Sequence, residues 1–303
     1  MGILEILLIV LGLCLFETIS SIDNAVINAE MLNTMSKKAR KWFLSWGILF
    51  AVFIVRGLLP LLIIWASAPS LGPWGALTAA FSNDPKVIEA IEAAAPLLLM
   101  AGGIFLIFLF FNWLFQEEKE FGLHGERFFH KHSVWFYAAV SIILTTIVWL
   151  ALQKDPMLAL AASIGSSLFF ITHGFKQNAQ MQETQLLKST RSDLAKIFYL
   201  EAIDTTFSID GVLGAFAFTL AVPLIFLGNG LGAIVLRQLT ISNIERVKKY
   251  IYLKNGAMYS VFFLGAIMLL DSFGFHIPSL VSPVITFIII GYFFFKSKRA
   301  LSH

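Results

Sequence analysis

The sequence predicts an all-α membrane protein, a polytopic bundle of about nine transmembrane helices. The chain of 303 residues is 58% hydrophobic and only 14% charged, whereas soluble domains carry about 25% charged residues. Its mean hydropathy is +0.80. Apolar segments of the length that a bilayer requires, about 20 residues, recur along the whole chain. We therefore expect a single transmembrane domain over residues 1–303.

Nine segments have this length and composition. We expect the first to be a retained span and not a removed signal peptide, because no basic residue precedes it. The nine are residues 3–22, 43–66, 94–115, 134–152, 157–175, 197–217, 222–241, 256–273 and 279–296.

The basic residues support this topology. Nineteen of the 22 Lys and Arg residues fall on the same side of the membrane when nine spans alternate. The positive-inside rule then predicts an external N-terminus and a cytoplasmic C-terminus. We expect the cell (inner) membrane as the location. The net charge of +3 is explained by this placement and does not indicate binding to nucleic acid. A single cysteine excludes an intrachain disulfide and a cysteine-based metal site.

A polar motif occurs twice inside the apolar segments. Residues 17–24 read Glu-Thr-Ile-Ser-Ser-Ile-Asp-Asn, and residues 204–211 read Asp-Thr-Thr-Phe-Ser-Ile-Asp-Gly, 187 positions later. The two spans are expected to cross in opposite directions. Inverted repeats with a site near the midplane are typical of secondary transporters. We therefore predict a first repeat over residues 1–115 and a second over residues 197–296.

The acids of the motif are the candidate ligands. A charged group in the bilayer core costs roughly 2.5–3.5 kcal/mol, so Glu17, Asp23, Asp204 and Asp210 should face the protein interior. Within each copy the second acid follows the first by six residues, about 240° around a helix. A helix break in spans one and six would bring both acids to one site. Asn24 and Gly211 tolerate the irregular backbone that a break requires.

Carboxylates with Asn24 and the hydroxyls of Ser21 and Ser208 would form an all-oxygen site. Such ligands favour Mn²⁺, Ca²⁺ or Mg²⁺ over zinc and copper. Glu201 is a further acid in span six. Two other interpretations stay open: the acids tie helices together through hydrogen bonds, or they form a proton relay. We give both less weight, because the acids are duplicated on opposed spans.

Other polar residues within the spans have weaker signals. Arg56 would pair with a motif carboxylate or form a purely structural ion pair, and the sequence does not separate these roles. Asn229 lies among glycines that favour close helix packing, so packing is weighted above ion coordination. His173 is interpreted as an interfacial histidine. The loop histidines have no metal-site spacing; they are His124, His130 and His132.

At the two motifs the sequence resembles the TerC family of integral membrane proteins, within the wider grouping of LysE-type exporters. The resemblance covers both motifs, their order and the Gly228–Gly232 stretch, and so most of the chain. It implies export of manganese or a related divalent cation. The ion ligands that it implies are Glu17, Asp23, Asn24, Asp204 and Asp210. The second copy ends in Asp-Gly where many members have Asp-Ser, which indicates a distinct branch.

The leading hypothesis is a secondary transporter that exports a divalent cation, with Mn²⁺ ahead of Ca²⁺, in exchange for protons. The chain has no P-loop signature, which favours an ion gradient as the energy source. The alternative is a membrane scaffold or metal-delivery partner for exported metalloenzymes. No catalytic spacing is visible, so we do not expect an enzyme or a prosthetic group. The expected partners are the lipid bilayer, the metal ion, and protein partners or further copies of the chain.

Overall fold

The computed structural model describes residues 2–47, 50, 56–67, 69, 72, 75, 85–187, 192–242 and 244–302. The elements in this part of the chain are all helical, which confirms the predicted all-α class. They are α1 (Ile3–Ser20), α2 (Ile22–Asn33), α3 (Lys37–Trp42), η1 (Phe43–Gly47), α4 (Arg56–Ser67), α6 (Pro85–Gln116), α7 (His124–Lys131), η4 (Ser133–Trp135), α8 (Phe136–Lys154), α9 (Pro156–Leu187), α10 (Asp193–Ala215), α11 (Val222–Ser242), α12 (Ile244–Lys248), α13 (Leu253–Ser272) and α14 (Val281–Leu301).

Seven of the described helices are long and apolar enough to cross a membrane, so the chain is a multi-pass membrane protein. They lie in α1, α6, α8, α9, α11, α13 and α14. The predicted span 197–217 lies in α10 up to its end at Ala215; this helix has sufficient length but carries several charged residues. The predicted span 43–66 includes η1 and α4, and its residues 48–49 and 51–55 fall outside the described residues. The count of nine crossings therefore stays a prediction.

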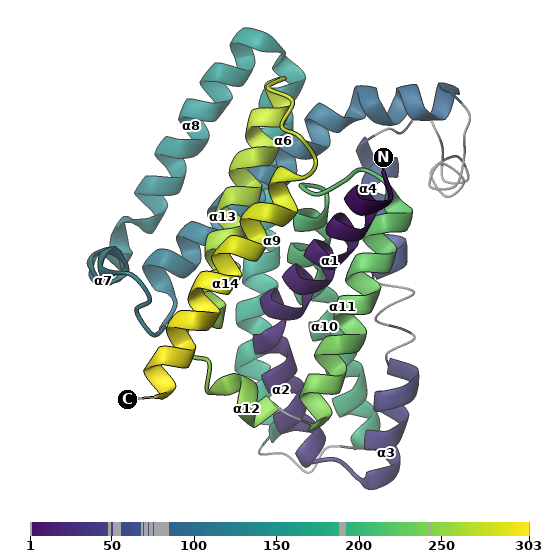
Figure 1. The fold of residues 1–303 in the computed structure, drawn as a ribbon, viewed down its shortest axis with the longest axis vertical. Coiled ribbons are helices and arrows are strands. Elements are labelled where there is room, and N and C mark those ends of the chain that lie inside the picture. The colour runs from purple at the N-terminus through teal and green to yellow at the C-terminus, as the bar shows by residue number, and fades with distance from the viewer. Residues whose placement is uncertain are drawn as a thin grey trace.

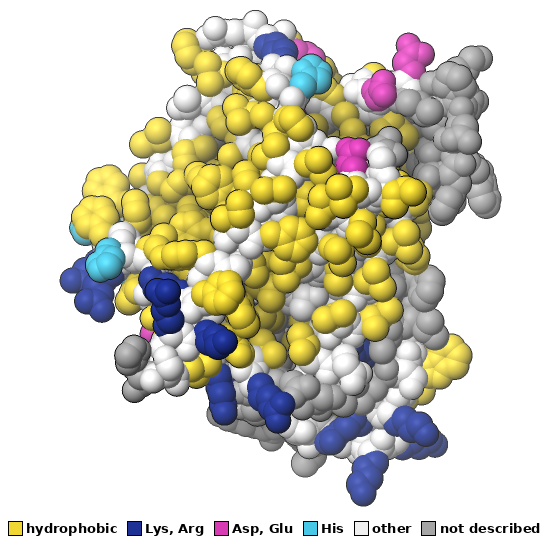
Figure 2. Space-filling view, viewed as in Figure 1, with side chains coloured by type: hydrophobic (Ala, Val, Ile, Leu, Met, Phe, Trp, Pro, Cys, Tyr) yellow, Lys and Arg dark blue, Asp and Glu magenta, His cyan; other side chains and the backbone are white. Residues whose placement is uncertain are grey.

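The helices form a bundle, with the N-terminus in the upper half and the C-terminus at the lower left of the view (Figure 1). The long helix α6 packs along α13 and α9, and α1 packs along α11. Helix α10 also contacts α1, α2 and α4, so elements from distant parts of the sequence surround the two motif copies. Hydrophobic side chains cover the middle of the face in Figure 2, and the Lys and Arg side chains of that face gather mainly toward the end that holds the C-terminus.

The helix break that the sequence predicts in the first motif copy is present. Helix α1 ends at Ser20, and Ser21 adopts φ −96° and ψ 10° before α2 begins at Ile22. In the second copy the prediction was wrong, because α10 continues without interruption through Asp210 and Gly211. The Ser208 hydroxyl donates to the carbonyl oxygen of Asp204 one turn earlier, a bond that an intact helix accommodates. Gly211 tolerates an irregular backbone but does not require one.

Glycines allow helix pairs to approach closely. A Cβ on Gly228 would lie 2.9 Å from Cδ1 of Leu13, so this glycine is needed where α11 crosses α1. A Cβ on Gly165 in α9 would lie 2.9 Å from the Cα of Ala101 in α6 and nearer still to its carbonyl oxygen. Since a backbone cannot rotate away as a side chain can, the contact at Gly165 leaves no room for a larger residue.

We therefore expect Gly165→Ala to push α6 and α9 apart and to lower the stability by about 1–3 kcal/mol, the usual cost of overpacking. The measurement is the thermal unfolding midpoint of the detergent-solubilised protein. Gly174→Ala is the matched control on the same helix, because nothing lies within 4 Å of its Cβ position. Equal midpoints for the two variants would contradict the assigned contact.

Candidate functional site

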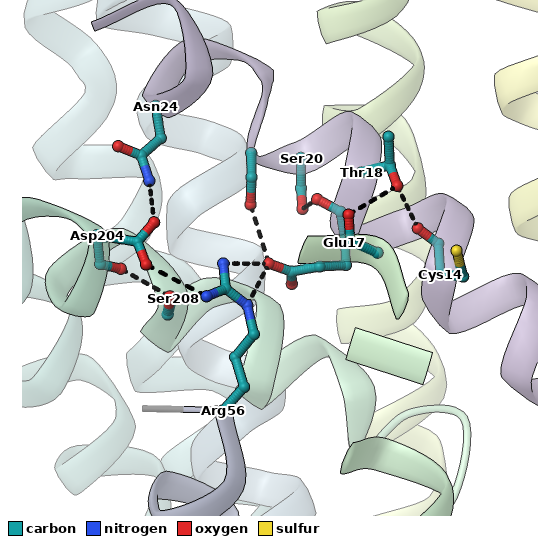
Figure 3. Close-up of polar contacts among 10 residues, drawn as sticks. Cys14, Glu17, Thr18, Ser20, Asn24, Arg56, Asp204 and Ser208 are labelled. Atoms are coloured by element: carbon teal, nitrogen blue, oxygen red, sulfur yellow. Dashed lines mark hydrogen bonds and ion pairs between the residues drawn. The ribbon is translucent and has the colours of Figure 1, made fainter. Parts of the chain in front are cut away.

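The two motif copies lie side by side in the folded chain, with Arg56 of α4 between them (Figure 3). Its Nη2 and Nε donate to Oε1 of Glu17 at 2.7 and 2.9 Å, and its Nη1 donates to Oδ2 of Asp204 at 3.2 Å. The side chains of Arg56 and Glu17 are only 2% and 1% exposed. One buried guanidinium thus pairs with the first acids of both copies, which together carry one negative charge more than it offsets.

The last residue of each motif contacts the first acid of the other copy. Asn24 donates from Nδ2 to Oδ1 of Asp204 at 2.6 Å. At the equivalent position of the second copy, a Cβ on Gly211 would lie 3.3 Å from Cδ of Glu17 and nearer still to Oε2. The Asn24 amide therefore links the two copies by a hydrogen bond, and the missing side chain at Gly211 lets Glu17 approach the second copy closely.

The motif serines have different partners. The Ser21 hydroxyl donates to Oε1 of Glu17 at 3.2 Å, whereas the Ser208 hydroxyl donates to the Asp204 main-chain carbonyl at 2.6 Å. Only the first serine therefore stabilises a carboxylate directly.

The second acids lie apart from this ion triad of Glu17, Arg56 and Asp204. Asp23 and Asp210 both line a cavity of about 560 Å³. Asp23 pairs with Lys254 of α13 at 2.6 Å, and Asp210 pairs with Lys176 of α9. The expectation that a break would bring both acids of a copy to one place is not met, because the two acids of each copy still project from different faces of their helices. The structure instead brings together the equivalent acids of the two copies. The first acids, Glu17 and Asp204, meet at Arg56, and the second acids, Asp23 and Asp210, both line the cavity.

The cavity includes polar residues that the sequence analysis missed. Glu117, just after α6, binds the same ammonium group of Lys254 at 2.7 Å. Asn112 donates from Nδ2 to Oε1 of Glu117 at 3.4 Å. His173 also lines the cavity, although the sequence favoured an interfacial role. Glu117 and Lys254 are hard to recognise as site residues in the sequence, because both lie at the ends of spans, where charged residues are common.

The electrostatics at the cavity favour the ionised form of Glu117. Burial by itself would raise the pKa of the Glu117 carboxyl, but Lys254 together with Lys176 and Lys119 outweighs it, and the pKa lies below its usual value. The cavity is lined by four carboxylates (Asp23, Glu117, Glu118 and Asp210) and two ammonium groups (Lys176 and Lys254), a formal excess of two negative charges. The lining therefore attracts cations.

The remaining supporting residues lie in tightly packed surroundings. Asn229 is fully buried, and neither amide atom has a hydrogen-bond partner in the described part of the chain. The Oε1 atom of Glu201 is likewise buried without such a partner among the described residues. Arg237 stacks over the Phe43 ring with its guanidinium carbon 4.5 Å from the ring centroid. The role of Asn229 and Glu201 in ion binding stays a prediction.

No group of three or more His, Cys, Asp or Glu side chains within the described ranges is arranged to hold a metal ion. In the ion triad and the cavity, Arg and Lys side chains contact the carboxylates that were predicted as ligands. The assignment of Glu17, Asp23, Asn24, Asp204 and Asp210 as metal ligands therefore stays a prediction. Any cation that binds these carboxylates would have to compete with the basic side chains.

Comparison with known proteins returned one family. The family described as "Protein of unknown function (DUF475)" matches residues 22–301. No curated protein and no solved structure matches the chain. The resemblance to the TerC family is not tested by this match and stays a prediction.

The ion triad leads to a stability prediction. Replacing Arg56 by Met leaves two buried carboxylates without their counter-ion, so we expect a loss of about 3–5 kcal/mol. Adding Glu17→Gln and Asp204→Asn to Arg56→Met should restore much of it, because no buried charge then remains unpaired. Thermal unfolding in detergent measures both effects, with the exposed Arg299→Met as control. A triple variant no more stable than Arg56→Met would argue against charge pairing as the cause.

Proposed function

Since the chain belongs to the DUF475 family, whose function is unknown, we propose a function from its own residues: a secondary transporter that moves a divalent cation across the membrane. The acid-rich cavity at the two motif copies is the observation that carries this proposal. Mn²⁺ is the leading substrate and Ca²⁺ the second, because the lining offers carboxylate and amide oxygens, which hard cations prefer. A divalent cation would also balance the two excess negative charges of the cavity.

The resident ammonium groups support a transport role over permanent storage of a metal. Each second acid of the motif already has a basic partner, Lys254 for Asp23 and Lys176 for Asp210. When the site is empty, both aspartates therefore keep a counter-ion in a region of low dielectric constant, where an unpaired charge is costly. A site that must release its cargo in every cycle needs this property.

We infer that the cavity opens toward the cytoplasm, because Glu117 and Lys254 line it and lie at the predicted cytoplasmic ends of their spans, and that the cation is exported. Basic side chains gather mainly toward the lower end of the view in Figure 2, where Figure 1 marks the C-terminus, and the positive-inside rule favours a cytoplasmic location for that end. An external N-terminus follows from the same rule, and we propose the inner membrane as the location. The ion triad would close the path between the motif helices in this state, and rocking of the predicted inverted repeats would open it.

Proton exchange is the proposed energy source, and no catalytic role or prosthetic group is proposed. A carboxylate that releases a metal ion can take up a proton in its place, which couples the two ions directly. Cation flux driven by an imposed pH gradient in liposomes tests this part of the proposal. Flux that is indifferent to the gradient would exclude proton exchange while leaving cation transport itself standing.

The main test is Mn²⁺ flux into proteoliposomes that contain the full-length protein. Asp23→Asn and Asp210→Asn should each reduce the initial rate by about tenfold or more, the effect of losing roughly 1.4 kcal/mol of binding free energy. Glu120→Gln is the matched control, because this exposed carboxylate lies close to Glu117 in the sequence and does not line the cavity.

Three outcomes can be distinguished. Flux that is lost in both aspartate variants and kept in the control supports the transporter. Wild-type protein that binds Mn²⁺ without moving it would favour the alternative role, delivery of metal to a partner protein. Flux that persists unchanged in both aspartate variants would reject the cavity as the path.

A further inference from the structure

Lys254 occupies an unusual position at the cavity. Its ammonium nitrogen lies 2.6 Å from Oδ2 of Asp23 and 2.7 Å from Oε2 of Glu117. The three residues belong to separate elements: Asp23 to α2, Lys254 to the start of α13, and Glu117 to the segment directly after α6. A positive charge between two carboxylates from different helices has the position that a bound cation would take.

Two residues that line the same cavity have side-chain oxygen atoms without a hydrogen-bond partner among the described residues. Asn112 is 2% exposed, and its Oδ1 has no hydrogen-bond partner among the described residues, while its Nδ2 donates to Glu117. A buried amide oxygen without a partner is costly, and this cost would be relieved by a cation or by water. Oδ1 of Asp210, on the opposite motif copy, is likewise buried without a partner in the described part of the chain. Both residues line the cavity with Asp23 and Glu117.

The exposure of these groups separates an outer from an inner ion pair. The side chain of Lys254 is 34% exposed and that of Glu117 is 35% exposed, whereas Lys176 and Asp210 are 14% and 16% exposed. Because Lys254 is partly in contact with solvent, its ammonium group can swing into water and leave the two carboxylates without becoming buried itself. The inner pair lacks this freedom.

From these contacts we propose that Lys254 is a built-in competitor for the transported cation. Its ammonium group occupies the cation position between Asp23 and Glu117, and Glu117 and Asn112 are ligands that neither motif copy supplies. The inference rests on the proposed function, since it names further residues of the same cation site. When Lys254 withdraws, the two carboxylates have a charge of −2, which a divalent cation neutralises and a monovalent cation does not.

A purely structural role for Lys254 makes a different prediction. If its ammonium group only ties α13 to α2 and to the end of α6, its removal should lower stability and leave cation affinity unchanged or reduced. If it competes with the cation, its removal should increase the affinity. The sign of the change in affinity therefore separates the two roles.

The experiment is titration of the detergent-solubilised full chain with Mn²⁺, followed by loss of the electron paramagnetic resonance signal of free Mn²⁺. We expect Lys254→Met to bind Mn²⁺ about tenfold more tightly than the wild type, because a coulombic competitor within hydrogen-bond distance is removed. Glu117→Gln should bind about tenfold more weakly. Lys249→Met, an exposed lysine just before α13, is the matched control and should leave affinity unchanged.

A second variant keeps the test decisive if Lys254→Met does not fold. Lys254→Arg retains the charge and adds a guanidinium that bonds carboxylates in a bidentate manner, so it should bind Mn²⁺ several-fold more weakly than the wild type. If the wild type binds Mn²⁺ and the Lys254 variants that fold bind it with the same affinity, the competitor role is overturned. The proposed transporter function then still stands. Absence of Mn²⁺ binding in the wild type and in every variant would overturn both.

Discussion

The buried guanidinium of Arg56 is the interaction on which the centre of this bundle depends. It contacts Glu17 and Asp204, which are 187 residues apart in the sequence. Removing such groups from water costs several kcal/mol for each ion, and good geometry is needed to repay it. The positions of α1, α4 and α10 are therefore coupled, because a shift of any one would leave a buried charge unpaired. Gly211 and Gly232 leave the space around Glu17 that this arrangement needs.

The duplicated motif has two structural tasks, one for each acid. The first acids lie on the faces where the two copies meet, and Arg56 and Asn24 satisfy them. The second acids point into the cavity and pair with lysines from α9 and α13. The second acid of each copy lies six positions after the first, which places the two on different sides of a helix. One repeated sequence thus supplies both a charged contact between the copies and the acidic lining of the cavity.

The same division explains how α10 carries its charges inside a membrane bundle. Glu201, Asp204 and Asp210 would be costly against lipid. Asp204 has Arg56 and Asn24 as partners, and Asp210 has Lys176, all from other helices. The hydrophobic residues of the molecule meanwhile cover the middle of the face seen in Figure 2. Helix α10 is therefore stabilised by tertiary contacts more than by its own apolar character.

The sequence by itself determined the all-helical membrane architecture and the location of the two acidic copies, because apolar length and repeated polar residues are local properties. It also located the break at Ser21. It did not reveal that α10 stays intact, since Gly211 permits a break without enforcing one. Only the tertiary structure decided which charges pair. Lys254 and Glu117 reach Asp23 because α2, α13 and the segment after α6 present these side chains to one another, and helix rotation is set by packing over the whole bundle. An ion pair between residues so distant in the chain leaves no local pattern in the sequence, whereas a membrane helix leaves a long apolar segment.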